Sequence, residues 1–372
     1  MRSTKKQLFM LIILLLLNGS WAWAEPVEAV KQDIDEASHL LLTYEKAGEK
    51  AIGNSHELKN KMVELKKLEE QREKASSDLG GSYPTDQGNG ADDSARFNLL
   101  KRLKSMDASL EMAKREIEIS KERIALETKN MKNEVNKLFR DKEITDLKLS
   151  IGKKELEMAQ AKESRGLVSR YDLEKSQEAY ETLLKGKEVL EKSIEASYIK
   201  LNLLLGMKDS ESYILEEDVE YKPIEKEDLD SLSIRLANSN PNIWNQQKKI
   251  EMAELDLALY VYNAGGDSYA IKEIDLQLEK NNLTNLKKNL EASTKTGYTQ
   301  IQQLEKNYEL LEANVKSAER ALIYVQAQYN VGMIVKLKLL EAELQVVQLK
   351  GDLKNRAIEH QKLKNALYKP YL

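Results

Sequence analysis

Apolar residues recur along this chain at alternating steps of four and three, a spacing that places them on one face of a helix. The clearest series consists of Leu99, Leu103, Met106, Leu110, Ala113, Ile117, Ser120 and Ile124. Lys, Glu, Arg and Asp fill the positions between them, as in a coiled-coil seam with a solvated outer face. The pattern predicts one helix over residues 95–165, about 70 residues and roughly 105 Å long. Such a helix requires a partner helix of similar length.

Residues that break helices gather in a few segments. No proline interrupts residues 85–222 or 242–369, so both windows can hold long helices. Residues 76–94 are rich in Gly, Ser, Asp and Asn and are predicted to form a loop. Residues 264–268 are a shorter version of the same break.

A shift of 166 positions superposes two parts of the sequence. It places Gly166 on Gly332, and it aligns the apolar pairs that follow these two glycines. The same shift pairs Val135 with Ile301, Leu138 with Leu304, and Leu201 with Leu367. The chain therefore contains an internal repeat, and repetition of this kind defines the architecture.

Each repeat is predicted to be a long antiparallel helical hairpin, which makes the fold all-α with little or no β structure. The first repeat covers residues 25–206 with its tip at 166–172. The second covers residues 229–372 with its tip at 332–338. Residues 207–228, which contain a proline and mixed charges, are predicted to link the two repeats.

Two weaker signals refine this division. Residues 54–58 faintly echo residues 239–243, which suggests that both repeats also begin alike. Inside the linker, residues 212–215 favour one short strand.

The glycine at each tip is expected to end a helix by adopting a left-handed conformation. In the first repeat Ser169 or Asp172 can cap the next helix, whereas residues 335–339 offer no hydroxyl or carboxylate. The apolar residues after the two glycines are expected to be exposed; they are Leu167, Val168, Met333 and Ile334. Paired apolar residues at an exposed bend suit a partner surface. The alternative is that they only pack the end of the hairpin.

Residues 1–24 are predicted to be a secretory signal peptide. Three cations precede an apolar run, and Ala22 and Ala24 form a small-x-small cleavage pattern. The run is about ten residues long, half of what spans a bilayer. The formal net charge is -4, and removal of the three cations leaves about -7, which favours neither nucleic acid nor anionic lipid. The absence of Cys excludes disulfides and thiolate metal sites.

Candidate chemistry is sparse. The sequence has no Ser/His/Asp cluster, no Gly-rich phosphate loop and no Cys nucleophile, so we expect neither catalysis nor a cofactor. His39, His56 and His360 lie far apart, and none has the spacing of a metal-binding pair. We expect all three on solvated helix surfaces, with no metal site.

The sequence resembles the TolC-like outer-membrane efflux family over roughly residues 52–368. The resemblance rests on five motifs in order: Gly166-Leu167-Val168 with Asp172-Leu173, Leu203 to Gly206, Asn240 to Ile243, Ile250-Glu251-x-Ala253, and Gly332 to Leu339. Each motif is weak alone, and their order, spacing and duplication make the match specific.

The resemblance implies a homotrimer whose long helices form a hollow cylinder. Its tips would dock an adaptor protein, which joins the cylinder to an inner-membrane pump of the ABC or proton-driven type. The docking residues carried over by position are Gly166, Leu167, Val168, Ser169, Arg170, Asp172, Gly332, Met333, Ile334, Val335 and Lys336. The family narrows its pore with acidic residues six and nine positions after the second tip glycine, where this chain has Lys338 and Glu341.

The sequence also departs from the family. Members insert a pair of membrane-spanning β-strands into each repeat, and residues 76–94 and 264–268 are too short and too polar for such strands. We therefore expect an exported protein of the cell envelope without barrel strands or a retained membrane helix. One alternative is a non-conducting coiled-coil scaffold of the envelope. An adaptor-like protein is a third class, but no segment resembles the β domain that it requires.

Overall fold

A computed structural model describes residues 40–79, 91–208, 213–215, 219–261 and 266–372, and its helices all belong to one unit, Leu41–Leu372. The helices of the first repeat are α1 (Tyr44–Asn54), α2 (His56–Leu79), α3 (Ala91–Glu163) and α4 (Arg170–Leu205). Those of the second are α5 (Leu229–Ser239), α6 (Pro241–Ala258), α7 (Tyr269–Asn330) and α8 (Lys336–Tyr368). Two three-residue strands, β1 (Leu40–Leu42) and β2 (Tyr213–Leu215), pair with each other. The all-α repeat that the sequence predicts is confirmed.

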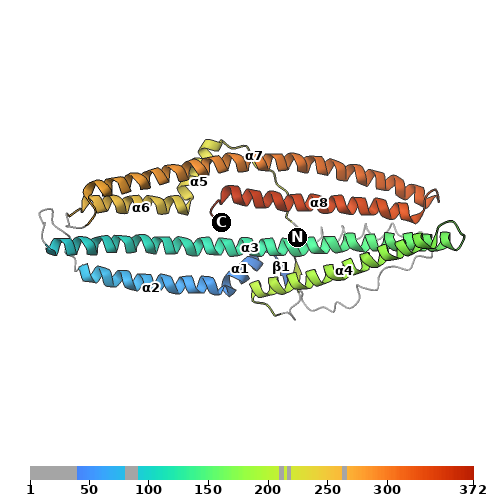
Figure 1. Ribbon diagram of the computed structural model, residues 1–372, viewed down its shortest axis with the longest axis horizontal. Helices are drawn as coiled ribbons and strands as arrows, with labels where there is room; N and C mark the ends of the chain where they lie inside the picture. The colour runs from blue at the N-terminus through green and yellow to red at the C-terminus, as the bar shows by residue number, and fades with distance from the viewer. Residues whose placement is uncertain (1–39, 80–90, 209–212, 216–218, 262–265) are drawn as a thin grey trace, which may run out of the picture. The chain divides into compact units, whose positions relative to one another are not determined.

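The two longest helices, α3 and α7, organise the repeats in the same way (Figure 1). Helix α3 packs against α2 over one half of its length and against α4 over the other, and α7 packs likewise against α6 and α8. Helix α3 also contacts α6 and α8, which joins the repeats. The neighbours are therefore α4, α3, α8 and α7 toward the tips, and α2, α3, α6 and α7 toward the opposite end. In both halves α3 lies inside the layer, and α7 lies at its edge.

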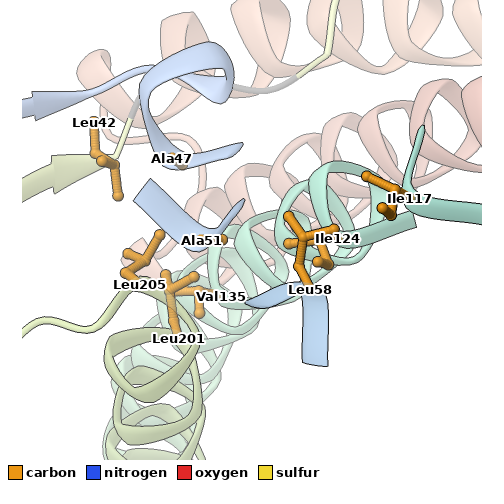
Figure 2. Close-up of a cluster of buried hydrophobic side chains, with 9 residues drawn as sticks. All are labelled: Leu42, Ala47, Ala51, Leu58, Ile117, Ile124, Val135, Leu201 and Leu205. Carbon is orange, nitrogen blue, oxygen red and sulfur yellow. The ribbon is translucent and has the colours of Figure 1, made fainter. Parts of the chain in front are cut away.

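Each repeat has its own apolar core. Figure 2 shows the core of the first repeat, formed by Leu42, Ala47, Ala51, Leu58, Ile117, Ile124, Val135, Leu201 and Leu205. The core of the second repeat is formed by Leu232, Leu236, Ile243, Leu290, Tyr298, Ile301 and Leu367. Every helix of a repeat contributes to its core, which is why the short helices α1 and α5 stay attached to the long ones.

Polar contacts reinforce the seam between the repeats. The Arg140 guanidinium of α3 donates a hydrogen bond to the side-chain oxygen of Asn355 in α8, at 2.9 Å. Nearer the opposite end, Lys101 of α3 pairs with Asp256 of α6 at 2.9 Å. Between these two levels the Arg115 guanidinium lies over the Trp244 ring, 4.4 Å from its centroid. Polar links of this kind set the register of the two helices and add little to the stability of their packing.

Several helix ends differ from those predicted. Helix α2 continues to Leu79 and α3 begins at Ala91, so both extend into the loop predicted at 76–94. The reason is that the Gly and Pro residues of this segment all lie within 80–90. The second break begins earlier than predicted, because α6 ends at Ala258. Residues 80–90 and 262–265, on which the expectation about membrane strands depends, lie outside the described residues, as does the predicted signal peptide.

Two further predictions concern the linker and the membrane. The short strand expected at 212–215 is present as β2, although part of the linker lies outside the described residues. Within the described ranges, no helix has both the length and the apolar character needed to cross a bilayer.

Candidate functional site: two hairpin tips and an adjoining groove

The first tip is a tight turn between α3 and α4. The Leu167 amide donates to the Lys162 carbonyl at 2.9 Å, and the Gly166 amide donates to the Glu163 carbonyl at 2.8 Å. Gly166 has φ +69°, the left-handed conformation that only glycine adopts without strain. These bonds satisfy carbonyls that the end of α3 would otherwise leave without a donor.

The second tip repeats the two bonds of this turn. The Met333 amide donates to the Gln328 carbonyl at 2.9 Å, and the Gly332 amide donates to the Tyr329 carbonyl at 2.9 Å. Gly332 has φ +76°. The left-handed glycines expected from the sequence are therefore present at both tips.

The helices that leave the two tips begin differently. Ser169 caps α4: its hydroxyl accepts from the Asp172 amide at 3.2 Å, and its own amide donates to the Asp172 carboxylate at 3.1 Å. Hydrogen bonds from the Ser169 hydroxyl and amide lower the pKa of Asp172. Val335 stands at the corresponding place before α8 and makes no side-chain capping bond. Both outcomes agree with the sequence.

Both tips are shorter than predicted. Arg170 and Asp172 already belong to α4, and Lys336 and Lys338 belong to the first turn of α8. The cause in the first repeat is the cap, which lets α4 begin directly after Ser169.

The apolar tip residues are only partly exposed as predicted. Leu167 and Met333 are 68% and 74% exposed, but Val168 and Ile334 are half-buried. The expectation of four exposed side chains was therefore wrong for Val168 and Ile334, and Val168 lines a groove between its own hairpin and α8. Val331 is also exposed, which the sequence reasoning missed; it is the C-cap of α7, between Asn330 and the glycine.

A groove of about 480 Å³ lies beside the first tip. Its apolar lining comes from Met158, Ala159, Val168, Ala179, Leu183 and Leu337. Lys162, Asp172 and Lys175 add charges of both signs. Because Leu337 belongs to α8, the groove brings the first tip together with the start of the last helix. Leu337 could have been found in the sequence as the apolar residue that follows the second tip at helical spacing.

The two pore candidates bind each other. The Lys338 ammonium lies 2.7 Å from the Glu341 carboxylate, one helical turn away on α8, and both side chains are partly exposed. The positive charge of Lys338 thus offsets the negative charge of Glu341. Lys336 instead lies over the Tyr329 ring, 5.4 Å from its centroid.

The histidines were predicted on solvated surfaces, and for His360 this prediction was wrong. Its side chain is 3% exposed, and its Nε2 lies 2.9 Å from a carboxylate oxygen of Glu305 on α7. His56 is exposed, and His39 lies outside the described residues. In the described part of the chain no cluster of His, Cys, Asp and Glu could hold a metal ion.

Comparison with solved structures gives this arrangement a fold class. The chain is similar to the outer membrane protein VceC of Vibrio cholerae, with 14% identity, 87% of this chain and 94% of that chain covered, and a TM-score of 0.59. It is also similar to CusC, with 12% identity, 94% and 98% covered, and a TM-score of 0.63. A third likeness is to the CmeC outer membrane channel of Campylobacter jejuni, with 10% identity, 86% and 84% covered, and a TM-score of 0.58.

No protein-family model and no curated protein matches the sequence. At such low identity the likeness to solved structures establishes the fold. The fold is the helical fold of outer-membrane channel proteins, and those channels are of the TolC family. The fold that the TolC-like resemblance implies is thus confirmed, and the docking role of the tips stays a prediction.

Proposed function

We propose that this protein is a TolC-like efflux or export component of the cell envelope. Copies of the chain assemble, as a homotrimer, into a helical conduit through which solutes leave the cell. The two tips dock an adaptor protein, and an inner-membrane pump of the ABC or proton-driven type supplies the energy. The chain itself contributes the wall of the conduit and no catalytic step.

The observation that carries this proposal is where the exposed apolar side chains lie. Along the edge helices they are Met62 and Val63 on α2, Tyr171, Leu184, Val189, Ile199 and Leu203 on α4, and Tyr269, Ile271, Ile274, Leu278, Leu310, Ile323 and Tyr324 on α7. Of the inner helices, α3 exposes Phe139 and Met158, and the described parts of α6 and α8 expose no large apolar residue. A monomer gains nothing from apolar edges, so these edges suit burial against another chain.

The two edges of one chain differ, and this difference determines the kind of interface that copies of the chain can form. The α7 edge differs from the edge formed by α2 and α4, so one copy offers two unlike surfaces. Unlike surfaces make a head-to-tail interface, which generates a ring when the rotation closes. A ring of helical layers encloses a channel, and the shared fold with outer-membrane channels supports three copies as the closing number.

The tips support the docking part of the proposal. Leu167 and Met333 expose apolar surface on turns whose backbone bonds are already satisfied internally, so the turns can keep their shape without a partner. The groove beside the first tip offers apolar walls with a charged rim, which fits an amphipathic helix of an adaptor.

Cysteine cross-linking tests the assembly, because the chain has no cysteine of its own. Leu310 on α7 and Val189 on α4 are 63% and 67% exposed, and they lie about equally far from their tips. The double variant with Leu310→Cys and Val189→Cys should form a disulfide ladder that ends at three copies. Each single variant should stay unlinked. The matched control joins Val189→Cys with Lys350→Cys on the inner helix α8 and should not link.

Cross-linking of the single variants alone would indicate a two-fold dimer and contradict the ring. Conduction is tested separately, by deleting the protein and measuring the export of toxic compounds. Leu167→Asp with Met333→Asp should match the deletion while keeping the trimer. Unchanged export after deletion would favour the non-conducting scaffold.

A further inference from the structure

A groove of about 740 Å³ lies at the end of the layer opposite the tips, where α2, α3, α6 and α7 run side by side (Figure 1). The lining from α3 is made mostly of small side chains, which leave the space between α3 and α6 unfilled; they are Ser105, Ala108, Ser109 and Ala113. A volume of this size lies within the range of sites that hold drug-sized molecules. The groove is distinct from the one beside the first tip.

The floor of the groove is apolar and adaptable. Leu68 of α2, Met112 of α3 and Met252 of α6 line it, and all three side chains are half-buried. Leu278 of α7 is exposed and lines the groove as well. Methionine side chains are flexible and polarisable, so surfaces built from them adjust to ligands of different shape. The floor therefore suits the apolar body of a small molecule.

The α7 wall of the groove adds two carboxylates, Asp275 and Glu279, one helical turn apart. Asp275 lies 3.9 Å from the Lys272 ammonium, which is closer to Asp267 at 2.9 Å. Glu279 accepts a hydrogen bond from the side-chain amide of Gln246. Because the lysine is shared and the amide carries no charge, both carboxylates keep negative charge on this wall.

The charge of the whole groove has the same sign. Five carboxylates and three ammonium groups line it, which leaves two negative charges in excess. Just outside the lining, Glu251 binds the ammonium of Lys248 at 2.7 Å, and Lys101 binds the carboxylate of Asp256 at 2.9 Å, so these two outer charges cancel. A groove with an apolar floor and excess negative charge is complementary to an apolar cation.

The groove and α1 lie on opposite faces of the layer. Helix α1 meets α3 at Ala125, where a Cβ added to Gly48 would lie 3.5 Å from the Ala125 Cβ. Ser109 of the groove precedes Ala125 by 16 residues, which is about 160° around the helix. The second repeat packs α5 against α7 as the first packs α1 against α3. The two short helices therefore project from one face, and the groove opens on the other.

The proposed conduit turns the face with the groove inward. Three copies with four helices at each level, spaced about 10 Å apart, form a ring of radius about 19 Å and a bore of roughly 28 Å. The α1 and α5 helices of three copies, each about 10 Å thick, would fill such a bore, so they belong on the outside. The place of the groove on the channel wall rests on the proposed function, whereas the groove itself lies within one chain.

We propose that this groove is a binding site for a small amphiphilic cation. The apolar body of the ligand lies on Met112 and Met252, where it removes half-buried apolar surface from water. Its positive group lies beside Asp275 and Glu279, whose charges the chain itself leaves uncancelled. In the conduit, a solute of this class is held on the channel wall on its way out.

Fluorescence anisotropy of rhodamine 6G, an apolar dye with one positive charge, tests the groove on the purified full-length protein. Fluorescein, which has the same ring system and negative charge, should not bind. Asp275→Asn with Glu279→Gln keeps the shape of both side chains and should weaken rhodamine binding about tenfold. Ser109→Trp fills the groove from an exposed position and should abolish binding. The control Glu273→Gln removes a carboxylate about 200° around α7 from Asp275 and should leave binding unchanged.

Three results would overturn the proposal. Absence of rhodamine binding to the unaltered protein would show that the groove holds no cation of this class. Equal binding of fluorescein, or unchanged affinity after Asp275→Asn with Glu279→Gln, would show that the carboxylates do not select the ligand. Unchanged binding after Ser109→Trp would show that the dye lies elsewhere. A protein that binds the dye in the groove but stays monomeric would refute the conduit alone, and a ring that binds no dye would refute the groove alone.

Discussion

The cores of the two repeats use the same buried positions but fill them with different residues. Val135 and Ile301 are both fully buried, and Leu201 and Leu367 are buried opposite them at the same spacing. One polar position is shared as well. Thr128 and Thr294, which the shift of 166 pairs, are each at most 2% exposed, and each hydroxyl donates to the carbonyl four residues earlier at 2.7 Å. The arrangement of the helices, which the two repeats share, thus determines which positions are buried and where a buried hydroxyl is tolerated.

The difference lies in how closely the first short helix approaches the long one. Ala47 and Ala51 of α1 correspond to Leu232 and Leu236 of α5, since they stand equally far before the buried residues Leu58 and Ile243. Small residues let α1 lie close to α3, and a Cβ added at Gly48 would meet the Cβ of Ala125 at 3.5 Å. The second repeat fills a wider gap with leucine. In each repeat the side chains match the space between the helices, so the packing is dense in both although the residues differ in size.

A buried lysine marks the same difference. Lys132 is fully buried where the second repeat has Tyr298, and its ammonium lies 3.6 Å from the centroid of the Tyr44 ring. Tyr44 begins α1, so the close approach of this helix brings an aromatic face to the cation. The long aliphatic stem of Lys132 fills the space that a tyrosine fills in the other repeat.

The largest expected effect on stability comes from exchanging the small and large residues at these equivalent core positions. Leu232→Ala should lower the free energy of unfolding by about 3 kcal/mol, because it leaves a cavity in the second core. Ala47→Leu should cost about 2 kcal/mol for the opposite reason, since α1 has no room for it. Denaturant unfolding followed by circular dichroism measures both. A neutral Ala47→Leu would contradict the close approach of α1.

The glycine that follows α4 gives the next largest effect on stability. Gly206 caps the C-terminal end of α4 with φ +65°, and a Cβ there would lie 2.6 Å from the Asn54 side chain. That side chain is held by hydrogen bonds to the carbonyls of Leu203 and Leu204. Gly206→Ala should therefore cost more than about 2 kcal/mol, through strain and a lost cap.

The tip glycine is the matched case without crowding. Gly332 has φ +76° and nothing within 4 Å of an added Cβ, so Gly332→Ala should cost only about 1–2 kcal/mol of backbone strain. Equal losses at Gly206 and Gly332 would show that the Asn54 contact does not matter.

Helix capping differs between the two tips, so substitutions there should change stability by smaller amounts and in opposite directions. Ser169→Ala removes the cap of α4 and should lower stability by about 1 kcal/mol. Val335→Ser adds a hydroxyl where α8 has none and should raise stability by roughly 0.5–1 kcal/mol, because the exposed valine gives up little burial. Thermal unfolding of the two variants should therefore shift in opposite directions. A loss in both would mean that Val335 contributes through packing.

The smallest effect concerns Tyr221, in the segment before α5, and Tyr368 at the end of α8. Burial and the nearby Glu305 raise the pKa of Tyr221 to about 12. Burial and the hydrogen bond to Glu227 raise the pKa of Tyr368 to about 12. Since an unfolded tyrosine titrates near pH 10, their stabilising contribution is complete below about pH 10 and is lost as the pH rises toward 12. An alkaline titration read by ultraviolet absorbance should show both groups ionising late.

Tyr368→Phe removes one of these late steps and serves as the control. On β2, in the linker, burial and the neighbouring Tyr198 of α4 raise the pKa of Tyr213 as well, so a raised tyrosine pKa is not confined to the second repeat. Complete ionisation of the tyrosines near pH 10 would contradict the packing around residues 219–228.

The parts of this fold that follow from local sequence were predictable. The seam of α3, the two left-handed glycines and the cap at Ser169 each depend on residues within a few positions of one another. The faint echo between residues 54–58 and 239–243 marks the junctions where α1 meets α2 and where α5 meets α6.

Contacts between distant segments were not predictable in this way. The burial of His360 depends on Glu305, 55 positions earlier, and on Tyr221, which lies still further away in the sequence. Val168 is half-buried beside a groove that includes Leu337, which lies in the other repeat. A periodicity indicates which face of a helix is apolar, and it does not indicate which distant segment covers that face.

The central claim is that two repeats on one plan form a layer whose unlike edges, α7 on one side and α2 with α4 on the other, close into a ring. Single-particle electron microscopy of the purified protein measures this directly. The account predicts a hollow assembly of three copies, with α7 of each copy packed against α2 and α4 of the next. Isolated single chains at high concentration, or a two-fold dimer joined through α7 alone, would contradict it.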